Sequence, residues 1–326
     1  GADGILDPLR FSTNLGSGVT LAADMITRMA PWGVGRGEEF QTDVLDAIRH
    51  GVAQGARATG QALRIAERDG IIDLSITAPI HKLAASSPMF RTTFGYGSAE
   101  ETIDFGAGMT YFYVGNGAFE LPAMADTEPA ERHASQSVRA SANAIRMLSR
   151  AGTVGLARRG AVLHFDEGWV LDKLAPGELE AQGRLARELG VLIQVYTQTP
   201  SGPVENKTAK YVGSGAMGYV EDPDEAVAAM KMMKFREPLD QRVLDRLVAP
   251  RNDAGQSDGI NRQSLQTLFK KDSRDVVRGS VFYISDATRR LAPVEVKLPK
   301  AFLAQVSTNS NDRRARDAAE AAARNP

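Results

Sequence analysis

The chain has 326 residues, of which 43% are hydrophobic and 24% charged, and its formal net charge is −1 at pH 7. These values are typical of a globular protein with one large or two modest domains, and they argue against strong non-specific binding to nucleic acid, although a local basic face is compatible with them. The chain has no cysteine, no apolar run long enough to span a membrane and no histidines at metal-ligand spacing, which excludes disulfides, thiolate zinc sites, cysteine nucleophiles and an integral membrane segment.

The N-terminal third is predicted to be mainly helical. Apolar residues recur at helical spacing across residues 38–85: Phe40, Val44, Ile48 and Val52, followed by Ala62, Ile65 and Ala66. Gly51, Gly55 and Gly60 predict breaks in this region. Pro79 is expected in the first turn of a further short helix.

Strands and helices alternate in the middle of the chain. The predicted elements are a strand over 109–114, an amphipathic helix over 131–150, a strand over 160–165, a helix over 178–189 and a strand over 190–196. Leu179, Leu185, Ala186 and Leu189 share one side of the second helix, and Gly190 is expected to end it. This order predicts an α/β fold with a mostly parallel sheet.

The C-terminal part has weaker signals. A strand is expected within residues 210–220, and Asp222 is expected to cap a helix that follows it. Residues 281–284 and 294–296 predict a closing β-hairpin. From Ser307 the chain is rich in alanine and charge, which predicts a polar, flexible tail.

An acidic pair, Asp166 and Glu167, follows the predicted strand over 160–165. At the carboxyl end of a parallel strand, side chains reach the crevice where ligands of open α/β sheets bind. An aspartate there can hold Mg²⁺ through water, and a glutamate can accept the proton of an attacking water. A strand that simply ends in a solvated turn gives the same pattern. The apolar run over 161–163 predicts burial of the strand on both faces.

The next predicted strand ends in Thr197 and Gln198, where polar side chains can contact a γ-phosphate or the attacking water. A turn before Pro200 would explain the same residues. Two such strand ends, separated by one helix, favour half of a nucleotide-hydrolysing site over two unrelated turns. His164 is predicted to be a packed, hydrogen-bonded core residue.

A phosphate-binding loop is missing from the sequence. Three segments are rich in glycine: residues 16–18, 33–37 and 115–117. None has the lysine followed by serine or threonine that reaches the phosphates and Mg²⁺. They are predicted to be turns.

Three segments resemble one family. They are Leu-His-Phe-Asp-Glu-Gly-Trp at 163–169, Ala-Arg-Glu-Leu-Gly at 186–190 leading to Thr-Gln-Thr-Pro-Ser at 197–201, and Gly-Ile-Leu-Asp-Pro-Leu at 4–9. They are similar to the C-terminal ATPase domain of type IV secretion (conjugative transfer) ATPases of the TraC and TrbE class, relatives of the FtsK/HerA motors. Gly168 stands where alanine is commoner in that family.

The resemblance implies a RecA-like P-loop NTPase core with a helical insertion and a closing hairpin. The core would comprise residues 1–30 and 105–306, the insertion 31–104 and the tail 307–326. It also implies ATP and Mg²⁺ as ligands, a ring-like homo-oligomer, other secretion-channel proteins as partners, DNA or protein as substrate, and a location in the cytoplasm or at the inner face of the cell membrane.

The resemblance assigns a role to each site residue. Asp166 would support Mg²⁺, Glu167 would activate water, Gln198 would sense the γ-phosphate and Thr197 would contact the nucleotide. On the helix between the strands, Arg187 is a candidate to reach a neighbouring subunit's nucleotide, although most helix arginines are solvated.

Two functions stay open at this point. In the first, the chain is part of an active motor whose phosphate loop lies before Gly1, because the chain begins like the middle of a domain. In the second, it is a non-catalytic RecA-like scaffold or assembly subunit. The missing phosphate loop and the near-neutral charge favour the second function.

Overall fold

The chain is a mixed α/β protein that divides into two units, residues 1–211 and 212–326. The computed structural model describes residues 3–12, 14–30, 37–97, 103–106, 108–112, 135–166, 168, 170–171, 177–205, 208–248, 264–270, 273, 276–285, 291–299 and 302. None of the helices in these ranges is both long enough and apolar enough to cross a membrane. Glu167 and the predicted tail over 307–326 lie outside the described residues.

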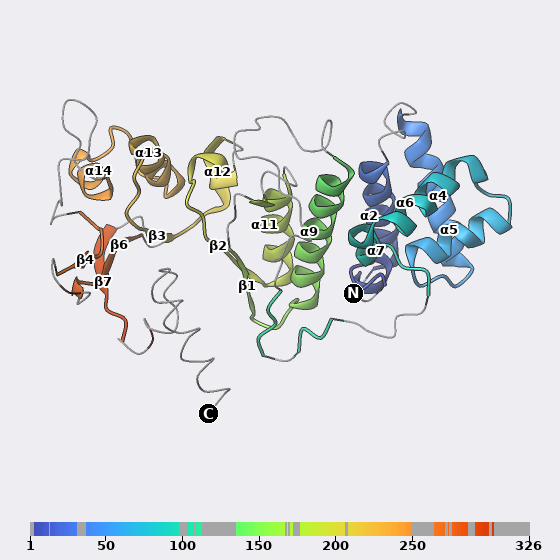
Figure 1. The fold of residues 1–326 in the computed structure, drawn as a ribbon, viewed down its shortest axis with the longest axis horizontal. Helices are drawn as coiled ribbons and strands as arrows, with labels where there is room; N and C mark the ends of the chain where they lie inside the picture. Colours follow the sequence, from blue (N-terminus) through green and yellow to red (C-terminus); the bar gives the residue numbers. More distant parts are fainter. Residues whose placement is uncertain are drawn as a thin grey trace. The chain divides into compact units, whose positions relative to one another are not determined.

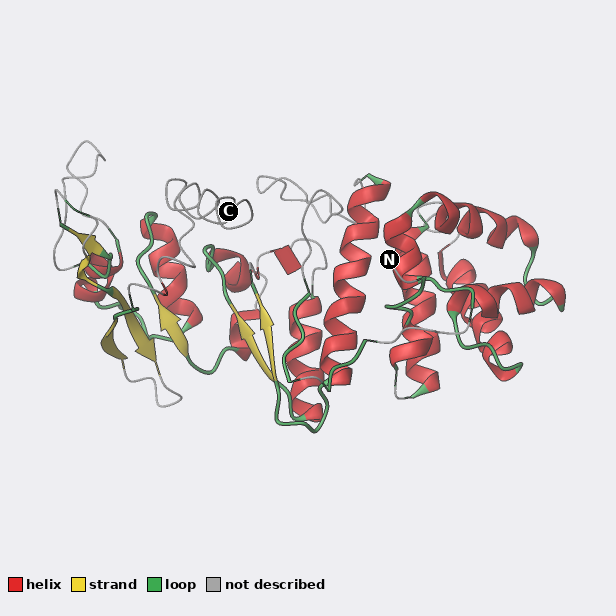
Figure 2. Cartoon of the chain, turned by 60° about the horizontal axis from the view of Figure 1, so that its bottom comes forward, coloured by secondary structure: helices red, strands yellow, loops and turns green. Residues whose placement is uncertain are grey.

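The first unit begins with a set of packed helices (Figures 1 and 2). These helices are α1 (Pro8–Phe11), α2 (Leu15–Met29), α4 (Gly37–Ala53), α5 (Thr59–Arg68), α6 (Leu74–Ser86) and α7 (Pro88–Thr93). Their buried apolar side chains form one core, which also includes Ala140, Met147 and Ala151 from α9 (Gln136–Gly155). The predicted boundaries at residues 30/31 and 104/105 therefore run through shared packing. Shared packing does not define which segment is inserted, so the partition stays a prediction.

Two of the three glycines that were predicted to break helices lie inside helices, at points where neighbouring segments approach closely. A Cβ on Gly51 would overlap the backbone of Ala62, because α4 and α5 cross closely at this point. A Cβ on Gly60 would meet the ring of Phe94 at 2.6 Å. Gly55, with φ of 93°, lies between α4 and α5 and does mark a break, as predicted.

Pro79 lies inside α6 rather than in its first turn. The helix begins earlier because the Asp73 carboxylate accepts a hydrogen bond from the Ser75 N–H at 2.6 Å and caps it. The glycines at 16–18 are also helical and form the first turn of α2, where Asn14 accepts from the Gly16 N–H. The prediction of a turn there was wrong, because the cap lies just before the glycines.

Asp7 is completely buried and ties three segments together. Its carboxylate accepts four hydrogen bonds, from the Leu9 N–H, the Gly95 N–H, and the N–H and hydroxyl of Thr59. Burial raises the pKa of Asp7, and these four donors work against that rise. The start of α1, the start of α5 and the backbone after α7 are thus fixed around one side chain.

The second half of this unit is a strand–helix–strand motif that follows α9. Its elements are β1 (Val162–Phe165), α11 (Glu178–Leu189) and β2 (Leu192–Val195), followed by α12 (Ser201–Glu205) and the short 3₁₀ helix η1 (Thr208–Tyr211). β1 and β2 pair in parallel, as predicted. The strand predicted over 109–114 is absent from its described part, since residues 109–112 have irregular backbone.

The second unit packs two helices on an antiparallel sheet. Its elements are β3 (Gly215–Met217), α13 (Pro223–Met232), α14 (Gln241–Leu247), β4 (Leu268–Phe269), β5 (Val276–Arg278), β6 (Ser280–Ser285) and β7 (Leu291–Val296). The order of the three-stranded sheet is β3-β6-β7, and β6 and β7 form the predicted hairpin. Asp222 caps α13 as expected, accepting from the Asp224 N–H at 2.9 Å.

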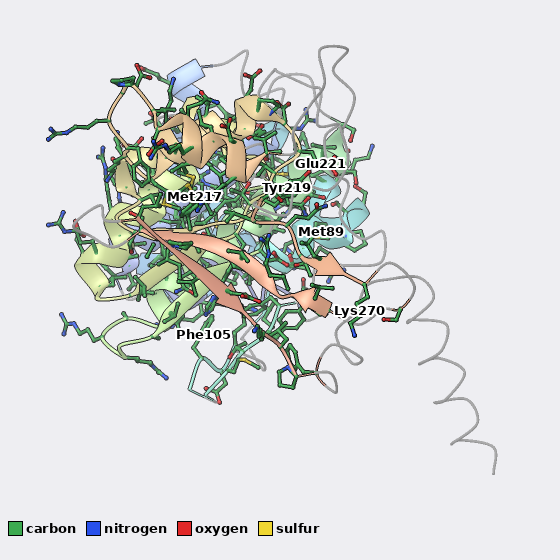
Figure 3. All side chains as sticks on the ribbon, turned by 90° about the vertical axis from the view of Figure 1, so that its left-hand side faces the viewer. Met89, Phe105, Met217, Tyr219, Glu221 and Lys270 are labelled. Carbon is green, nitrogen blue, oxygen red and sulfur yellow. The ribbon has the colours of Figure 1, made fainter. Side chains whose placement is uncertain are left out.

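One face of this sheet packs on the helices and the other is exposed. Met217, labelled in Figure 3, packs with Tyr283 against α13 and α14 in the core of the unit. The alternate positions on β6 and β7 face away from that core, and Ile284, Val294 and Val296 are exposed there. Within the described residues, the sheet is therefore apolar on both sides.

Replacing Asp7 with asparagine should lower the stability of the first unit by about 1–3 kcal/mol. The amide NH₂ group of asparagine would face N–H groups that now donate to the carboxylate, so some of these hydrogen bonds would be lost. The matched control is Asp73→Asn at the exposed cap of α6, where asparagine caps as well as aspartate. Thermal unfolding followed by circular dichroism compares them. Equal melting temperatures for the two variants would contradict the role given to Asp7.

Candidate functional site

The ends of β1 and β2 lie at one edge of the parallel pair. The register aligns Val162 with Leu192 and Phe165 with Val195, so neither strand extends beyond the other. The pairing continues past the strands, since the Tyr196 N–H donates to the Phe165 carbonyl at 2.9 Å. Residues that directly follow the two strands are therefore neighbours, as the sequence predicts.

Three of the predicted site residues lie within three residues of these ends. Asp166 is exposed and follows β1, while Thr197 is half-buried and Gln198 exposed after β2. The Thr197 hydroxyl accepts a hydrogen bond from the Thr199 N–H at 3.1 Å, which folds the chain before Pro200 into a local turn. The turn predicted as the alternative thus exists, and it coexists with the convergence of the strand ends. Glu167 lies outside the described residues.

Gly168 joins the two strand ends by close packing. Its N–H donates to the Tyr196 carbonyl at 2.7 Å, and the residue is buried. A Cβ at this position would overlap Cγ1 of Val195. The glycine therefore lets the chain after the acidic pair lie directly on β2, and alanine would not fit without movement of a β-branched side chain.

One face of the parallel pair is exposed, so the prediction of burial on both faces was wrong. Val162 is 39% and Leu192 57% exposed on this face, whereas Leu163 on the other face contacts Gly152 of α9. His164 is also exposed rather than part of the core. Its Nδ1 lies 3.0 Å from the Tyr196 hydroxyl and its ring stacks on that ring, so only the predicted hydrogen bonding is confirmed.

The arginines of α11 lie away from this edge. Arg187 is exposed in the last turn of α11, just before β2 begins, so it lies toward the amino edge of the strands. The helix has 12 residues and is about 18 Å long, which separates Arg187 from Asp166 of the same chain. Arg184 instead donates to Glu180 and Tyr211 on the surface of the unit. Arg187 is therefore too far from Asp166 to contribute to a site at this edge of the same chain.

A buried charge network holds α11 against α9. Glu178 is 2% exposed and accepts hydrogen bonds from Arg146, Arg150 and Gln182, with Arg146 Nε at 3.0 Å and Arg150 Nε at 2.8 Å. Arg146 also contacts Asp24 of α2 at 2.6 Å. The network therefore joins α2, α9 and α11.

The fully buried side of α11 is mostly polar. Its buried residues are Glu178, Gln182 and Ala186, while the leucines predicted to face the core are only half-buried. The partners of Glu178 lie 28 and 32 residues earlier in the chain. Nothing in the local sequence marks this glutamate as buried, which is why it was missed.

The chemistry of this edge suits a magnesium-bound nucleotide only in part. Asp166 offers the carboxylate oxygens that Mg²⁺ prefers, and Thr197 and Gln198 offer neutral polar groups. Within the described ranges, no group of three or more acidic or histidine side chains could enclose a metal by itself. A P-loop enzyme does not need one, because phosphate oxygens complete the shell. The glycine segments at 33–36 and 115–117 lie outside the described residues.

Comparison of the chain with protein-family models, with curated proteins and with solved structures found no match.

Gly168→Ala should destabilise the first unit by about 1–3 kcal/mol through overpacking against Val195. Adding Val195→Ala should make the double variant more stable than the sum of the two single losses predicts. Gly183→Ala within α11 is the matched control, because its Cβ would make only ordinary contact with Tyr211 at 3.6 Å. Urea unfolding measures all four variants, and purely additive losses would refute the close contact.

Glu178→Ala should lower the free energy of unfolding by about 3–5 kcal/mol, because it leaves two arginines without their buried carboxylate. Glu180→Ala on the same helix is the control, since Glu180 pairs with Arg184, Lys210 and Tyr211 in solvent-exposed contacts. Hydrogen exchange of α11 would show the difference directly. Similar protection in both variants would show that the buried network does not hold the helix.

Proposed function

We propose that this chain is the ATPase part of a motor that moves DNA or protein through a conjugative or type IV secretion channel. The observation that carries the proposal is the parallel β1–α11–β2 unit, with Asp166 after one strand and Thr197 and Gln198 after its neighbour. In α/β sheets with crossover helices, that edge is where ligands bind. The resemblance of residues 163–169 and 197–201 to transfer ATPases supplies the class.

Each residue has one task in the proposed reaction. Asp166 would hold Mg²⁺ through water, and the ion would neutralise charge on the β- and γ-phosphates. Glu167 would accept the proton of the attacking water, and Gln198 would orient that water against the γ-phosphate. Thr197 would contact the nucleotide beside Gln198. Gly168 holds the chain after the acidic pair against β2, and this contact would help to position the acidic pair.

The position of Arg187 favours a ring. It lies at the end of α11 that is remote from Asp166 in the same chain, and in motors of this class an arginine can complete a neighbour's site. We infer that catalysis needs at least two copies. A non-catalytic scaffold built on the same sheet is the second candidate, and the missing lysine-containing phosphate loop favours it.

ATP turnover in the natural protein separates these functions. Asp166→Asn and Glu167→Gln should each reduce the turnover number by about 100-fold or more, because proton transfer and metal positioning contribute on that order. Asp222→Asn is the control, since Asp222 only caps α13. Turnover that is unchanged by both site substitutions would refute the motor, and no turnover in the unsubstituted protein would favour the scaffold.

Mixing experiments test the shared site. Protein carrying Arg187→Ala and protein carrying Glu167→Gln should both be inactive alone. Mixed in equal amounts, they should recover part of the activity, because some interfaces then combine an intact arginine with an intact glutamate. Absence of recovery, with ring assembly confirmed by light scattering, would contradict a trans role for Arg187.

A further inference from the structure

Residues 103–106 and 108–112, here called the loop, expose two large side chains. Met109 is 87% and Tyr111 79% exposed, which are the highest values among the large hydrophobic residues that the structure describes. The sequence around them is aromatic and β-branched and would normally enter a strand. Irregular backbone in place of the expected strand often marks a functional segment.

The loop is held in place despite this exposure. Phe105, labelled in Figure 3, packs against Gly155 at the end of α9 and contacts Phe112 with ring centroids 6.1 Å apart. The Thr110 hydroxyl donates to the Asp104 carbonyl at 3.1 Å, and the Asp104 carboxylate accepts from the Gly106 N–H. Met109 and Tyr111 are therefore presented from an anchored turn.

A turn that carries two exposed arginines lies beside this loop. Arg158 and Arg159 form the turn between α9 and β1, and a Cβ on Gly106 would lie 3.3 Å from a terminal guanidinium nitrogen of Arg159. Neither side chain forms an ion pair with any residue in the described ranges. Two cationic groups thus lie in the turn beside the loop that carries the exposed Tyr111, on a chain whose net charge is only −1.

Arg158 has an unusual backbone. Its φ is 59°, in the left-handed region that favours glycine, and its N–H donates to the Leu189 carbonyl at 2.8 Å. Glycine would satisfy this geometry without strain. A residue other than glycine is uncommon in this region, and such strain often lies at functional positions.

We propose that Met109, Tyr111, Arg158 and Arg159, here called the loop patch, bind single-stranded nucleic acid. The arginines match the phosphate backbone in charge, and the exposed tyrosine and methionine offer surfaces on which unpaired bases stack. The loop patch lies at the amino edge of β1, opposite the edge that carries Asp166. The inference deepens the proposed motor function, since it identifies where the transported strand would be held.

Fluorescence anisotropy with a labelled oligothymidine of about 20 nucleotides tests this in the full chain without nucleotide. Tyr111→Ala should weaken binding roughly fivefold to 100-fold. Arg158→Gly should weaken binding and reduce the slope of log affinity against log salt by about 0.7. Its melting temperature should stay the same or rise, because the substitution relieves the backbone.

Lys234→Gly is the matched control. Lys234 has φ of 61° and one positive charge but is not part of the loop patch. Its replacement relieves similar strain and should leave binding unchanged. No binding by the unsubstituted chain, or equal losses for Arg158→Gly and Lys234→Gly, would overturn the assignment. Equal competition by a duplex of the same length would exclude single-strand stacking. The binding assay contains no nucleotide, so it is independent of ATP turnover. The loop patch can therefore be refuted while the ATPase proposal stands, and the ATPase proposal can be refuted while the loop patch stands.

Discussion

The strand–helix–strand part of the first unit depends on the ion pairs that the buried Glu178 carboxylate forms with two arginines of α9. This carboxylate holds α11 parallel to α9 through two arginines, and Arg146 extends the link to Asp24 in α2. The buried side of α11 has little apolar surface, so charge pairing replaces part of the usual hydrophobic packing. Such pairs demand a defined geometry, since an unmatched charge in the interior is costly. The position of β2 after α11, and with it the alignment of the two strand ends, follows from this geometry.

Local signals were sufficient for many elements. The helix over 178–189 has the predicted bounds because Gly177 and Gly190, both with positive φ, flank it. The hairpin of β6 and β7 follows from its apolar strands. The failures have non-local causes: Gly51 and Gly60 allow chain segments to touch, and residues 109–112 lie in a loop anchored by Phe105. A sequence shows that a glycine breaks propensity, but not which neighbour needs the space.

The candidate site also combines features that the sequence predicts with features that it does not predict. Strand ends are local features, so Asp166, Thr197 and Gln198 could be placed at one edge from the order of elements alone. The close fit of Gly168 on Val195 could not, because it depends on the distance between two strands. The strained backbone of Arg158 also left no sequence signal, since Arg-Arg-Gly reads as an ordinary solvated turn.

The outward face of the β3-β6-β7 sheet has a practical consequence for the second unit. Ile284, Val294 and Val296 are exposed on adjacent strands, and β7 is the last strand of this sheet in the described residues. An apolar face next to an edge strand favours self-association as protein concentration rises. A single lysine on the outer face of β7 is the substitution that natural edge strands use against aggregation.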